Sequence, residues 1–408
     1  MAQNTIGTIF KVTTFGESHG TALGCVVDGV PAGISIDEGR IQSALDRRKP
    51  GQSFGGKNNA SVTARKEDDK AEILSGIFEG KSEGTPIGIV IRNTSQHSKD
   101  YGNLATTFRP GHADFAFYEK YGFRDYRGGG RSSGRETAAR VAAGAIALQI
   151  LESLGDIKIT AYTERAAGVS IEKVDYSQIE ENALRAPDNE AAARMNHKIE
   201  EIRSNKDSAG GIIACRITGI PAGIGEPVFG KLDAELGKAI LSIGAVKGIE
   251  FGAGFAAADL TGSVDNDNMR AAQDGKVRFE SNNAGGITGG ISDGNDIFFR
   301  VAVKPVPSIF QSQKTISAEE AGRYTDSDLV IEGRHDVCLC PRIVPVIEAS
   351  FPESRRRDVG PEIAEVRVVD LKHPFDPVFK YSRLMDLVTD DLRCIVDRSD
   401  FFIGDDPC

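Results

Sequence analysis

The sequence predicts an α+β fold, in which strands pair in hairpins and helices are grouped instead of alternating strictly with strands. Residues 6–36 alternate short apolar runs with Gly and Pro turns, as hairpin strands do. Two further strands, predicted over 277–280 and 296–303, have no helical pattern between them. The chain has 408 residues, of which 40% are apolar, so it can bury a large core. This order favours α+β over a doubly wound α/β sheet.

The first part of the chain is predicted to be mainly strands. A helix is predicted over 37–47, because Asp37 can cap it and Ile41 and Leu45 are spaced by about one helical turn. The basic, Gly- and Asn-rich stretch 48–70 is predicted to be a mobile loop. The strands of this part are predicted over 6–12, 22–27, 71–78 and 87–93.

The clearest helical pattern spans 134–154. Its apolar stripe is followed by Gly155, a common stop signal, and its many Ala and Gly residues suit close packing inside a helical layer. A polar amphipathic helix is predicted at the periphery over 188–206. The remaining predictions are strands over 157–163, 211–218, 246–251, 277–280 and 296–303, and helices over 231–241 and 344–349.

Composition limits the classes of partner. The net charge of -10 disfavours nucleic acid and anionic membranes as partners, although a local arginine cluster can still bind an anion. The six Cys are scattered, which fits reduced thiols in the cytoplasm better than a disulfide framework. Residues 1–15 have no signal-peptide pattern, and we expect no apolar run near the roughly 20 residues that a membrane helix needs.

Two patterns have alternatives that we disfavour. Residues 335–340 place His335 near Cys338 and Cys340, but Cys-x-Cys is not the usual zinc spacing. Residues 252–257 fit the GxGxxA dinucleotide pattern after a strand, yet the residues that follow do not predict the long helix that this motif requires.

Three motifs predict a site for anionic ligands. His19 lies in the exposed turn Gly-Glu-Ser-His-Gly, where it can donate a proton or simply hydrogen-bond locally. His112 lies in Arg-Pro-Gly-His-Ala-Asp, which is either a rigid functional turn or a surface ion pair. Residues 127–136 place three Gly between two Arg at a helix start, which favours phosphate binding over a flexible linker.

Three further segments are less decisive. Arg47 and Arg48 precede Lys49 in a loop that is either an anion clamp or a solvated run of charge. Residues 281–294 are small and Gly-rich, and by themselves they favour a chain of tight turns. Asp336 lies between cationic residues, so it should stay ionised and accept a proton only when it is positioned against an acid.

These motifs together resemble the chorismate synthase family over essentially the whole chain. The resemblance rests on GESHGTALGCVVDGVP (16–31), GGGRSSGRETAARVAAGAI (128–146) and RHDVCLCPRIVPVIEAS (334–350), with RPGHAD, SNNAGGITGGIS and KPVPS in the same order. It implies a 1,4-anti elimination of phosphate and a C6 hydrogen from 5-enolpyruvylshikimate 3-phosphate, which gives chorismate. It also implies that reduced FMN is required without net redox change, the flavin accepting the C6 hydrogen at N5.

The resemblance also assigns roles to residues. His19 would assist the leaving phosphate, His112 would stabilise reduced FMN near N1 and O2, and Asp336 would accept a proton at N5. Substrate would be bound by Arg47, Arg48 and Arg135. FMN would be bound by Arg131, Ser132, Ser133, Gly244, Ala245, Gly289, Lys304, Pro305, Val306, Pro307, Ser308 and Arg334.

One position departs from the family pattern. Family members often carry a second Arg six residues after the position of Arg48, where this chain has Phe54. Lys57 or Arg65 would substitute for it, or the loop lacks that cation. Position 244 is Gly where some relatives have Asn, which a backbone contact would tolerate.

At the level of architecture, the resemblance implies a β-α-β sandwich with helices between two antiparallel sheets, assembled as a homotetramer. A single domain would span 1–408, with internal halves of roughly 1–165 and 207–350 and a C-terminal extension, 351–408, packed on the core. It leaves open whether the flavin is reduced by an external flavin reductase or by an NADPH-driven activity of the chain itself. The rival readings are a flavin- or nicotinamide-dependent oxidoreductase and a non-catalytic protein that binds phosphorylated ligands.

Overall fold

The first sheet is built from the N-terminal part of the chain. The computed structural model describes residues 3–51, 53–54, 57–58, 61, 67–94, 104–273, 275–319, 322–331 and 335–350. Five antiparallel strands pair in the order β1-β2-β3-β9-β6. Their bounds are β1 Thr5–Ile6, β2 Lys11–Gly16, β3 Ala22–Asp28, β9 Ile87–Arg92 and β6 Ala71–Ile73. The predicted N-terminal hairpin is present as β2 and β3, but its first strand is Lys11–Gly16 and the predicted bounds of 6–12 are wrong.

The second sheet is built from later residues and is also antiparallel. Its strands pair in the order β11-β10-β12-β18-β13. Their bounds are β10 Lys158–Ala166, β11 Val169–Ser170, β12 Gly211–Thr218, β13 Val246–Phe251 and β18 Ile297–Val303. The predicted bounds of β12 and β13 match the structure, because β-branched runs there end at Gly or at a turn.

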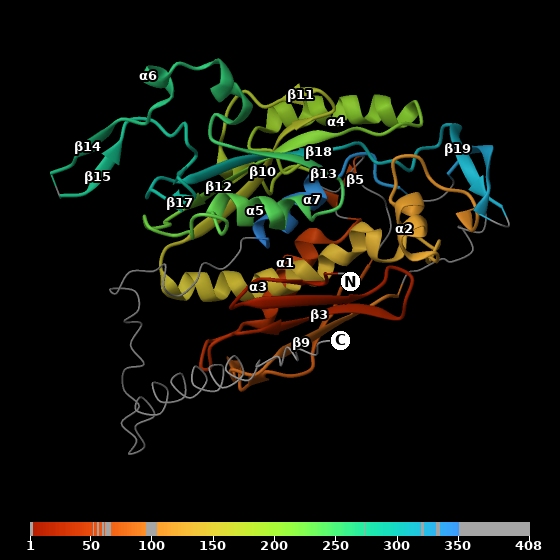
Figure 1. Cartoon of the computed structure of the whole chain (residues 1–408), viewed down its shortest axis with the longest axis horizontal. Helices are drawn as coiled ribbons and strands as arrows, with labels where there is room; N and C mark the ends of the chain where they lie inside the picture. The colour runs from red at the N-terminus through yellow and green to blue at the C-terminus, as the bar shows by residue number, and fades with distance from the viewer. Residues whose placement is uncertain are drawn as a thin grey trace, which may run out of the picture. The chain divides into compact units, whose positions relative to one another are not determined.

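Four helices fill the space between the two sheets, so the predicted α+β sandwich is confirmed (Figure 1). Helices α1 and α3 pack on each other, α3 contacts the first sheet, and α5 and α7 contact the second. Their bounds are α1 Glu38–Arg48, α3 Thr137–Leu154, α5 Leu232–Leu241 and α7 Cys340–Glu348. The polar helix α4, Asn189–Ser204, packs against edge strand β11 and is capped by Asp188.

Helix α3 is the centre of this helical layer. Twelve of its residues are buried, and a Cβ on Gly144 would lie 2.4 Å from the Cβ of Ala349, so Gly is needed for this close approach. By length and apolar composition, the helical stretch Gly134–Leu154 is also the one described segment that could cross a membrane. Our expectation that no run is apolar enough is therefore wrong for α3, because a helix buried on most sides has the composition of a membrane helix.

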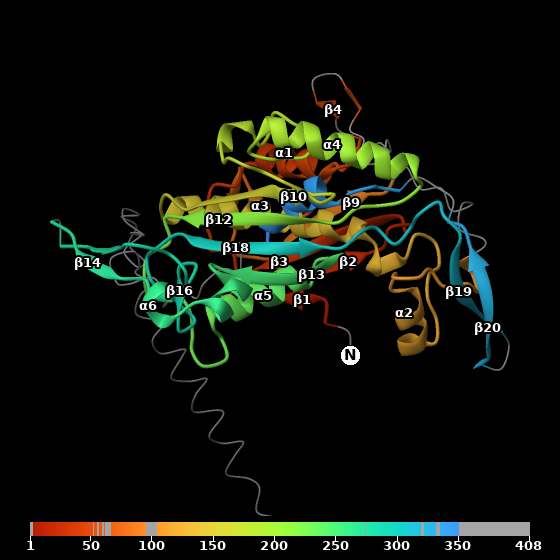
Figure 2. The same cartoon turned by 90° about the horizontal axis from the view of Figure 1, so that it is seen from above.

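A smaller unit stands at one end of the sandwich in both views (Figures 1 and 2). Helix α2, Asp114–Tyr121, lies beside the hairpin of β19, Gln313–Ala318, and β20, Tyr324–Leu329. Phe108 N donates to Ile316 O at 3.2 Å, which joins the segment before α2 to the hairpin. Neither the helix nor the hairpin is predicted from the sequence.

Short elements complete the described part of the chain. They are β4 Ser53–Phe54, β5 Lys57–Asn58, β7 Ile77–Phe78, β8 Lys81–Ser82, β14 Met269–Ala271, β15 Val277–Phe279, β16 Ile287–Thr288, β17 Ile291–Ser292 and α6 Gly262–Asp265. Short 3₁₀ turns cover Gly130–Ser132, Gly134–Glu136, Tyr176–Gln178 and Gly254–Asp259. The last of these follows the GxGxxA pattern in place of a long helix, which removes the dinucleotide alternative.

Helix α7 differs from its prediction. It begins at Cys340, four residues before the predicted start, and ends at Glu348. Pro341 occupies the first turn, where its missing N–H costs no helical hydrogen bond. The predicted C-terminal extension, 351–408, lies outside the described residues.

Candidate active site

A large cleft of about 1920 Å³ lies where the predicted motifs meet. Among its described lining residues, ten are Lys or Arg and six are Asp or Glu, the reverse of the balance in the whole chain. Pockets for single small ligands typically measure about 300–1,000 Å³. The cleft therefore has the charge for anionic ligands and the room for two of them.

The glycine loop, Gly128–Gly130, brings the two predicted histidines together. A Cβ on Gly128 would lie 2.2 Å from His19 Cε1, and a Cβ on Gly129 would lie 2.8 Å from His112 Cε1. All three glycines have positive φ, from 52° to 88°, a region that favours Gly. Two histidines that are 93 positions apart in sequence thus pack against successive residues of one loop.

His19 stands behind this loop, in the turn between β2 and β3. Its side chain is buried, and its Nδ1 lies 3.0 Å from Ser18 Oγ. The turn is closed by Gly20 N, which donates to Glu17 O at 3.2 Å. Gly128 lines the cleft whereas His19 does not, so the imidazole reaches the cleft only past the glycine loop.

His112 lies on the other side of the loop and lines the cleft. Its Nδ1 lies 2.9 Å from Asp114 Oδ1, and Arg109 makes a bidentate pair with the same carboxylate at 2.7 and 2.9 Å. Burial would raise the pKa of Asp114, but the hydrogen bonds from Arg109 and His112 hold it well below its ordinary value. Burial lowers the pKa of His112, and the hydrogen bond to Asp114 opposes this shift without reversing it.

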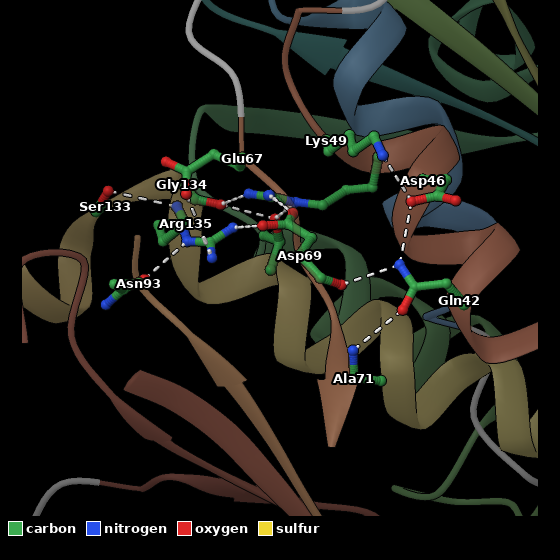
Figure 3. A network of polar contacts seen from close by, with 12 residues as sticks. Gln42, Asp46, Lys49, Glu67, Asp69, Ala71, Asn93, Ser133, Gly134 and Arg135 are labelled. Carbon is green, nitrogen blue, oxygen red and sulfur yellow. Dashed lines mark hydrogen bonds and ion pairs between the residues drawn. The ribbon is translucent and has the colours of Figure 1, made fainter. Parts of the chain in front are cut away.

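Arg48 and Arg135 converge on a shared acid, Asp69, and Figure 3 shows Arg135 in contact with this carboxylate. Arg48 Nη1 lies 3.3 Å from Asp69 Oδ2, and Arg135 Nη1 donates to Asp69 Oδ1. Arg48 also donates to Thr137 Oγ1 at 3.1 Å and to Gly134 O at 2.7 Å. These bonds fix two arginines at the mouth of α3, beside the N-terminal end of the helix that attracts anions.

A third arginine, Arg342, adds to the positive potential at this end of the cleft. Its Nη1 lies 2.5 Å from Asp336 Oδ2, so the predicted proton acceptor is held by an ion pair. Burial, and next the charge of Arg342, lower the pKa of Arg48 to about 9. An anion bound beside Arg48 would relieve this repulsion, which is why the cluster suits a phosphate or a carboxylate.

The predicted flavin segments 244–245 and 304–308 lie on the far side of the cleft, beside the turn that carries His112. Lys304 Nζ donates to Gly111 O, and Lys304 N donates to Ala245 O at 2.9 Å. Burial, helped by Lys247, lowers the pKa of Lys304. Ser132 and Ser133 line the same cleft, with Gly244, Ala245, Lys304, Val306, Pro307 and Ser308.

Four predicted residues are placed differently. Arg47 is engaged by Glu180 and Glu348 and does not line the cleft. Neither Pro305 nor Gly289, which lies in the turn between β16 and β17, lines it. Arg131 lines the cleft, but its guanidinium donates to Thr14 and Gly16 of β2 and so anchors the glycine loop. Arg334 lies outside the described residues, as do the side chains at 54, 57 and 65 that bear on the missing loop cation.

Several polar residues of the site are missed by the sequence analysis. Asp69 lies just before β6 and Asn93 just after β9, and neither belongs to a recognisable local motif. Arg342 lies in an apolar segment and Arg124 in an irregular one. Asp114 stands in the predicted motif without a role, although it holds His112. For Arg342, the signal was a lone cation two residues into an apolar helix that starts beside Asp336.

The predicted alternative of a metal site gains no geometric support. The part of the chain that the structure describes has no group of three or more His, Cys, Asp or Glu placed to hold a metal ion. Cys338 and Cys340 are buried, and their side chains contact each other.

Comparison with known proteins gives one consistent result. Residues 10–352 match the family model described as chorismate synthase. A protein named chorismate synthase from Cytophaga hutchinsonii is 54% identical over 351 residues, covering 85% of this chain and 94% of that protein. One from Lachnospira eligens is 53% identical, covering 86% and 93%. A crystal structure titled as chorismate synthase aligns with a TM-score of 0.65 at 29% identity, covering 85% of this chain and 90% of that one.

Proposed function

The chain belongs to the chorismate synthase family, and we propose that its cleft holds 5-enolpyruvylshikimate 3-phosphate against reduced FMN with the residues described above. The enzyme is a carbon-oxygen lyase of the shikimate pathway: it eliminates phosphate and the C6 hydrogen in a 1,4-anti reaction that gives chorismate, with no net redox change. The single observation that carries the proposed site is the glycine loop, because the side chains of His19 and His112 pack against its successive residues Gly128 and Gly129.

The arginine cluster is proposed to bind the substrate's anionic groups. Arg48 and Arg135 are buried, and both are oriented by Asp69. Arg135 Nη2 is buried and makes no hydrogen bond among the described residues, and only an ion pair of 3.7 Å joins it to Glu67 Oε2, so we propose that it turns a hydrogen-bond donor toward an oxygen of the substrate. Arg47 is the exception among the predicted substrate ligands, because its guanidinium is already paired with two carboxylates.

His19 is proposed to protonate the departing phosphate. A phosphate dianion is a poor leaving group, and an imidazole with a pKa near neutral can supply a proton as the bond breaks. The positive field of Arg48 and Arg135 stabilises the negative charge that develops on the phosphate.

The residues of the cleft fit reduced FMN. The glycine loop lines the cleft without side chains of its own, and the serines and Lys304 suit a phosphate. The apolar side chains of Leu339, Ile343 and Val346 line the same space. When bound, reduced FMN supplies the electron density that makes loss of an unactivated C6 hydrogen possible.

His112 and Asp336 are proposed to act on protons at the edge of the flavin. Asp114 fixes the orientation of His112 through Nδ1, which leaves Nε2 for the cleft. An anionic partner there would raise the pKa of His112 above its value in the free protein. Asp336 forms an ion pair with Arg342, and its proposed role is to accept a proton from a bound ligand that presents an acidic one.

The first experiment follows both products without oxygen. Purified protein, chemically reduced FMN and 5-enolpyruvylshikimate 3-phosphate are mixed anaerobically, and chorismate, phosphate and the flavin spectrum are recorded together. We expect equal, catalytic release of chorismate and phosphate with the flavin still reduced at the end. Oxidation of the flavin in step with substrate would support an oxidoreductase, and binding without product would support a non-catalytic role.

The role of His19 is tested separately. We expect His19→Ala to bind FMN normally and to lose about 10²–10⁴-fold in turnover, the usual contribution of an acid-base residue. Flavin fluorescence titration measures the first quantity and single-turnover chorismate formation measures the second. Normal turnover in this variant would remove His19 from the mechanism.

Other parts of the proposal come from the family. We propose a cytoplasmic homotetramer that takes reduced FMN from an external flavin reductase. Sedimentation gives the oligomeric state. A turnover assay with NADPH and oxidised FMN, without added reductase, tests the source of electrons, because activity in that mixture would mean that the chain reduces its own flavin.

A further inference from the structure

The side chain of Asn93 joins the turn that carries His19 to the guanidinium of Arg135. Asn93 Nδ2 donates to Glu17 O and to Gly20 O, each at 2.9 Å, and these carbonyls flank His19 in sequence. Asn93 Oδ1 accepts from Arg135 Nε at 3.2 Å (Figure 3). One amide thus contacts both the proposed acid's turn and a proposed substrate ligand.

The register of the first sheet explains why Asn93 lies there. Arg92, the last residue of β9, pairs with Ala22, the first residue of β3. The next residue on β9 therefore meets the turn between β2 and β3, and Asn93 N donates to Thr21 O at 3.1 Å. An amide is needed at this position, because both donors and an acceptor are used at once.

Arg135 is held from two sides. Asn93 accepts a hydrogen bond from its Nε and Asp69 accepts one from its Nη1, while Nη2 makes no hydrogen bond among the described residues and lies 3.7 Å from Glu67 Oε2. The fork of the guanidinium is rigid, so two fixed nitrogens determine where Nη2 points. Any displacement of Asn93 would therefore move the His19 turn and Nη2 of Arg135 relative to each other.

We propose that Asn93 is a positioning residue for the elimination. It keeps His19 and Arg135 correctly placed relative to each other, so that both act on the same phosphate. This inference rests on the proposed function, since it assumes that Arg135 grips the phosphate that His19 protonates. Asn93 itself does not line the cleft, so it acts through the two groups that it joins. A misplacement of about 1 Å between reacting groups can cost about 10²-fold in rate.

The test is a double-mutant cycle with His19. Asn93→Ala is expected to lower kcat by about 10²-fold with a smaller change in substrate affinity, measured by equilibrium binding in the presence of oxidised FMN. In a His19→Ala background the same substitution is expected to change the single-turnover rate by less than about threefold, because one of the two groups whose relative position it sets is already gone. An equal loss in both backgrounds would overturn the proposal.

Two further variants serve as an alternative to Asn93→Ala and as a control. Asn93→Asp keeps the acceptor for Arg135 and loses both donors to the turn, so it is expected to repeat the cycle if Asn93→Ala does not fold. Gln42→Ala is the matched control, because Gln42 is an amide that donates to Asp69 O at 3.2 Å and has no contact with the His19 turn. Its effect on kcat, whatever the size, is expected to be the same with and without His19.

The wild-type enzyme separates this inference from the proposed function. If the wild type forms no chorismate in the anaerobic assay, the proposed function fails and the inference fails with it. If the wild type turns over and the Asn93–His19 cycle is additive, only the positioning role is wrong.

Discussion

The two histidines of the cleft are carried by walls that are packed very differently. The sheet wall, which consists of β2, β3, β9 and the His19 turn, belongs to the main core, where residues such as Leu23, Ile89 and Ile91 are at most 1% exposed. The α2 wall, residues 104–126 with the hairpin β19–β20, has a separate cluster of Leu104, Leu329 and Ile331. A wall with so few buried apolar contacts opens at a lower free energy than a wall of the main core.

The α2 wall relies on aromatic and ionic contacts instead of a deep core. Phe108 contacts the rings of Phe115, Tyr118 and Tyr324 with centroids 5.3–6.2 Å apart, yet Phe115 and Tyr324 are about two-fifths exposed. The buried pair of Arg109 and Asp114 holds His112 within this wall. We infer that the site combines a rigid acid side with a softer side that can yield when ligands enter.

The largest expected effect is on the α2 wall alone. Asp114→Asn leaves Arg109 buried without its partner and should destabilise this wall by about 3–5 kcal/mol, the usual cost of breaking a buried ion pair. Hydrogen exchange is expected to rise in 104–126 while β3 and β9 keep their protection. Equal loss of protection in both walls would show that they open as one unit.

The next largest expected effect tests the contact between Gly128 and His19. Gly128→Ala would force a residue with positive φ and a Cβ into His19, so turnover should fall by about 10²-fold with the fold retained. Gly134→Ala is the matched control, since nothing lies within 4 Å of its added Cβ and its φ is not in the left-handed region. Steady-state kinetics of the two variants decide the point, and equal losses would mean that the contact with His19 is irrelevant.

The smallest effect is a pH dependence confined to the α2 wall. Burial lowers the folded-state pKa of His112, with Arg109 and Lys304 facing it, so the opened state binds a proton more readily. Stability is then complete above the ordinary His pKa of about 6.5 and declines as pH falls below that value. The depressed pKa of Asp114 acts in the same direction, but only below its ordinary value of about 3.9.

Hydrogen exchange of the free protein at pH 7.5 and pH 6, corrected for intrinsic rates, measures this dependence. We expect faster opening of 104–126 at the lower pH and no such change in β3. His112→Gln should remove the difference. Slower opening at pH 6 would contradict the sign.

Most of the sandwich could be predicted because its elements have strong local signals. Asp37 caps α1 by accepting from Gly39 N, as its position before the helix indicated. Helix α2 could not be predicted in this way, because Pro110 and Gly111 read as a turn and its aromatic residues are weak helix formers. Tertiary contacts with β19–β20 stabilise it instead.

The motifs of the site could be predicted from the sequence, but the hydrogen bonds that join them could not. Gly- or Arg-rich segments that can be recognised from the sequence contain His19, His112, Arg48 and Arg135. Asp69 and Asn93 are single polar residues at strand ends, and their partners lie 66 and 42 positions away. Only the pairing of β3 with β9 determines which residue meets the His19 turn, and that register is not written in a local motif.

The three glycines of the loop have positive φ, so the chirality of a residue substituted there can be used to probe the loop. At Gly128, φ is +62° and an L-side chain would collide with His19, so strain and collision are confounded in any natural substitution. A D-residue adopts positive φ without strain and projects its side chain in the mirror direction. D-alanine introduced there by semisynthesis would therefore separate the effect of the backbone conformation from the effect of a collision with the imidazole.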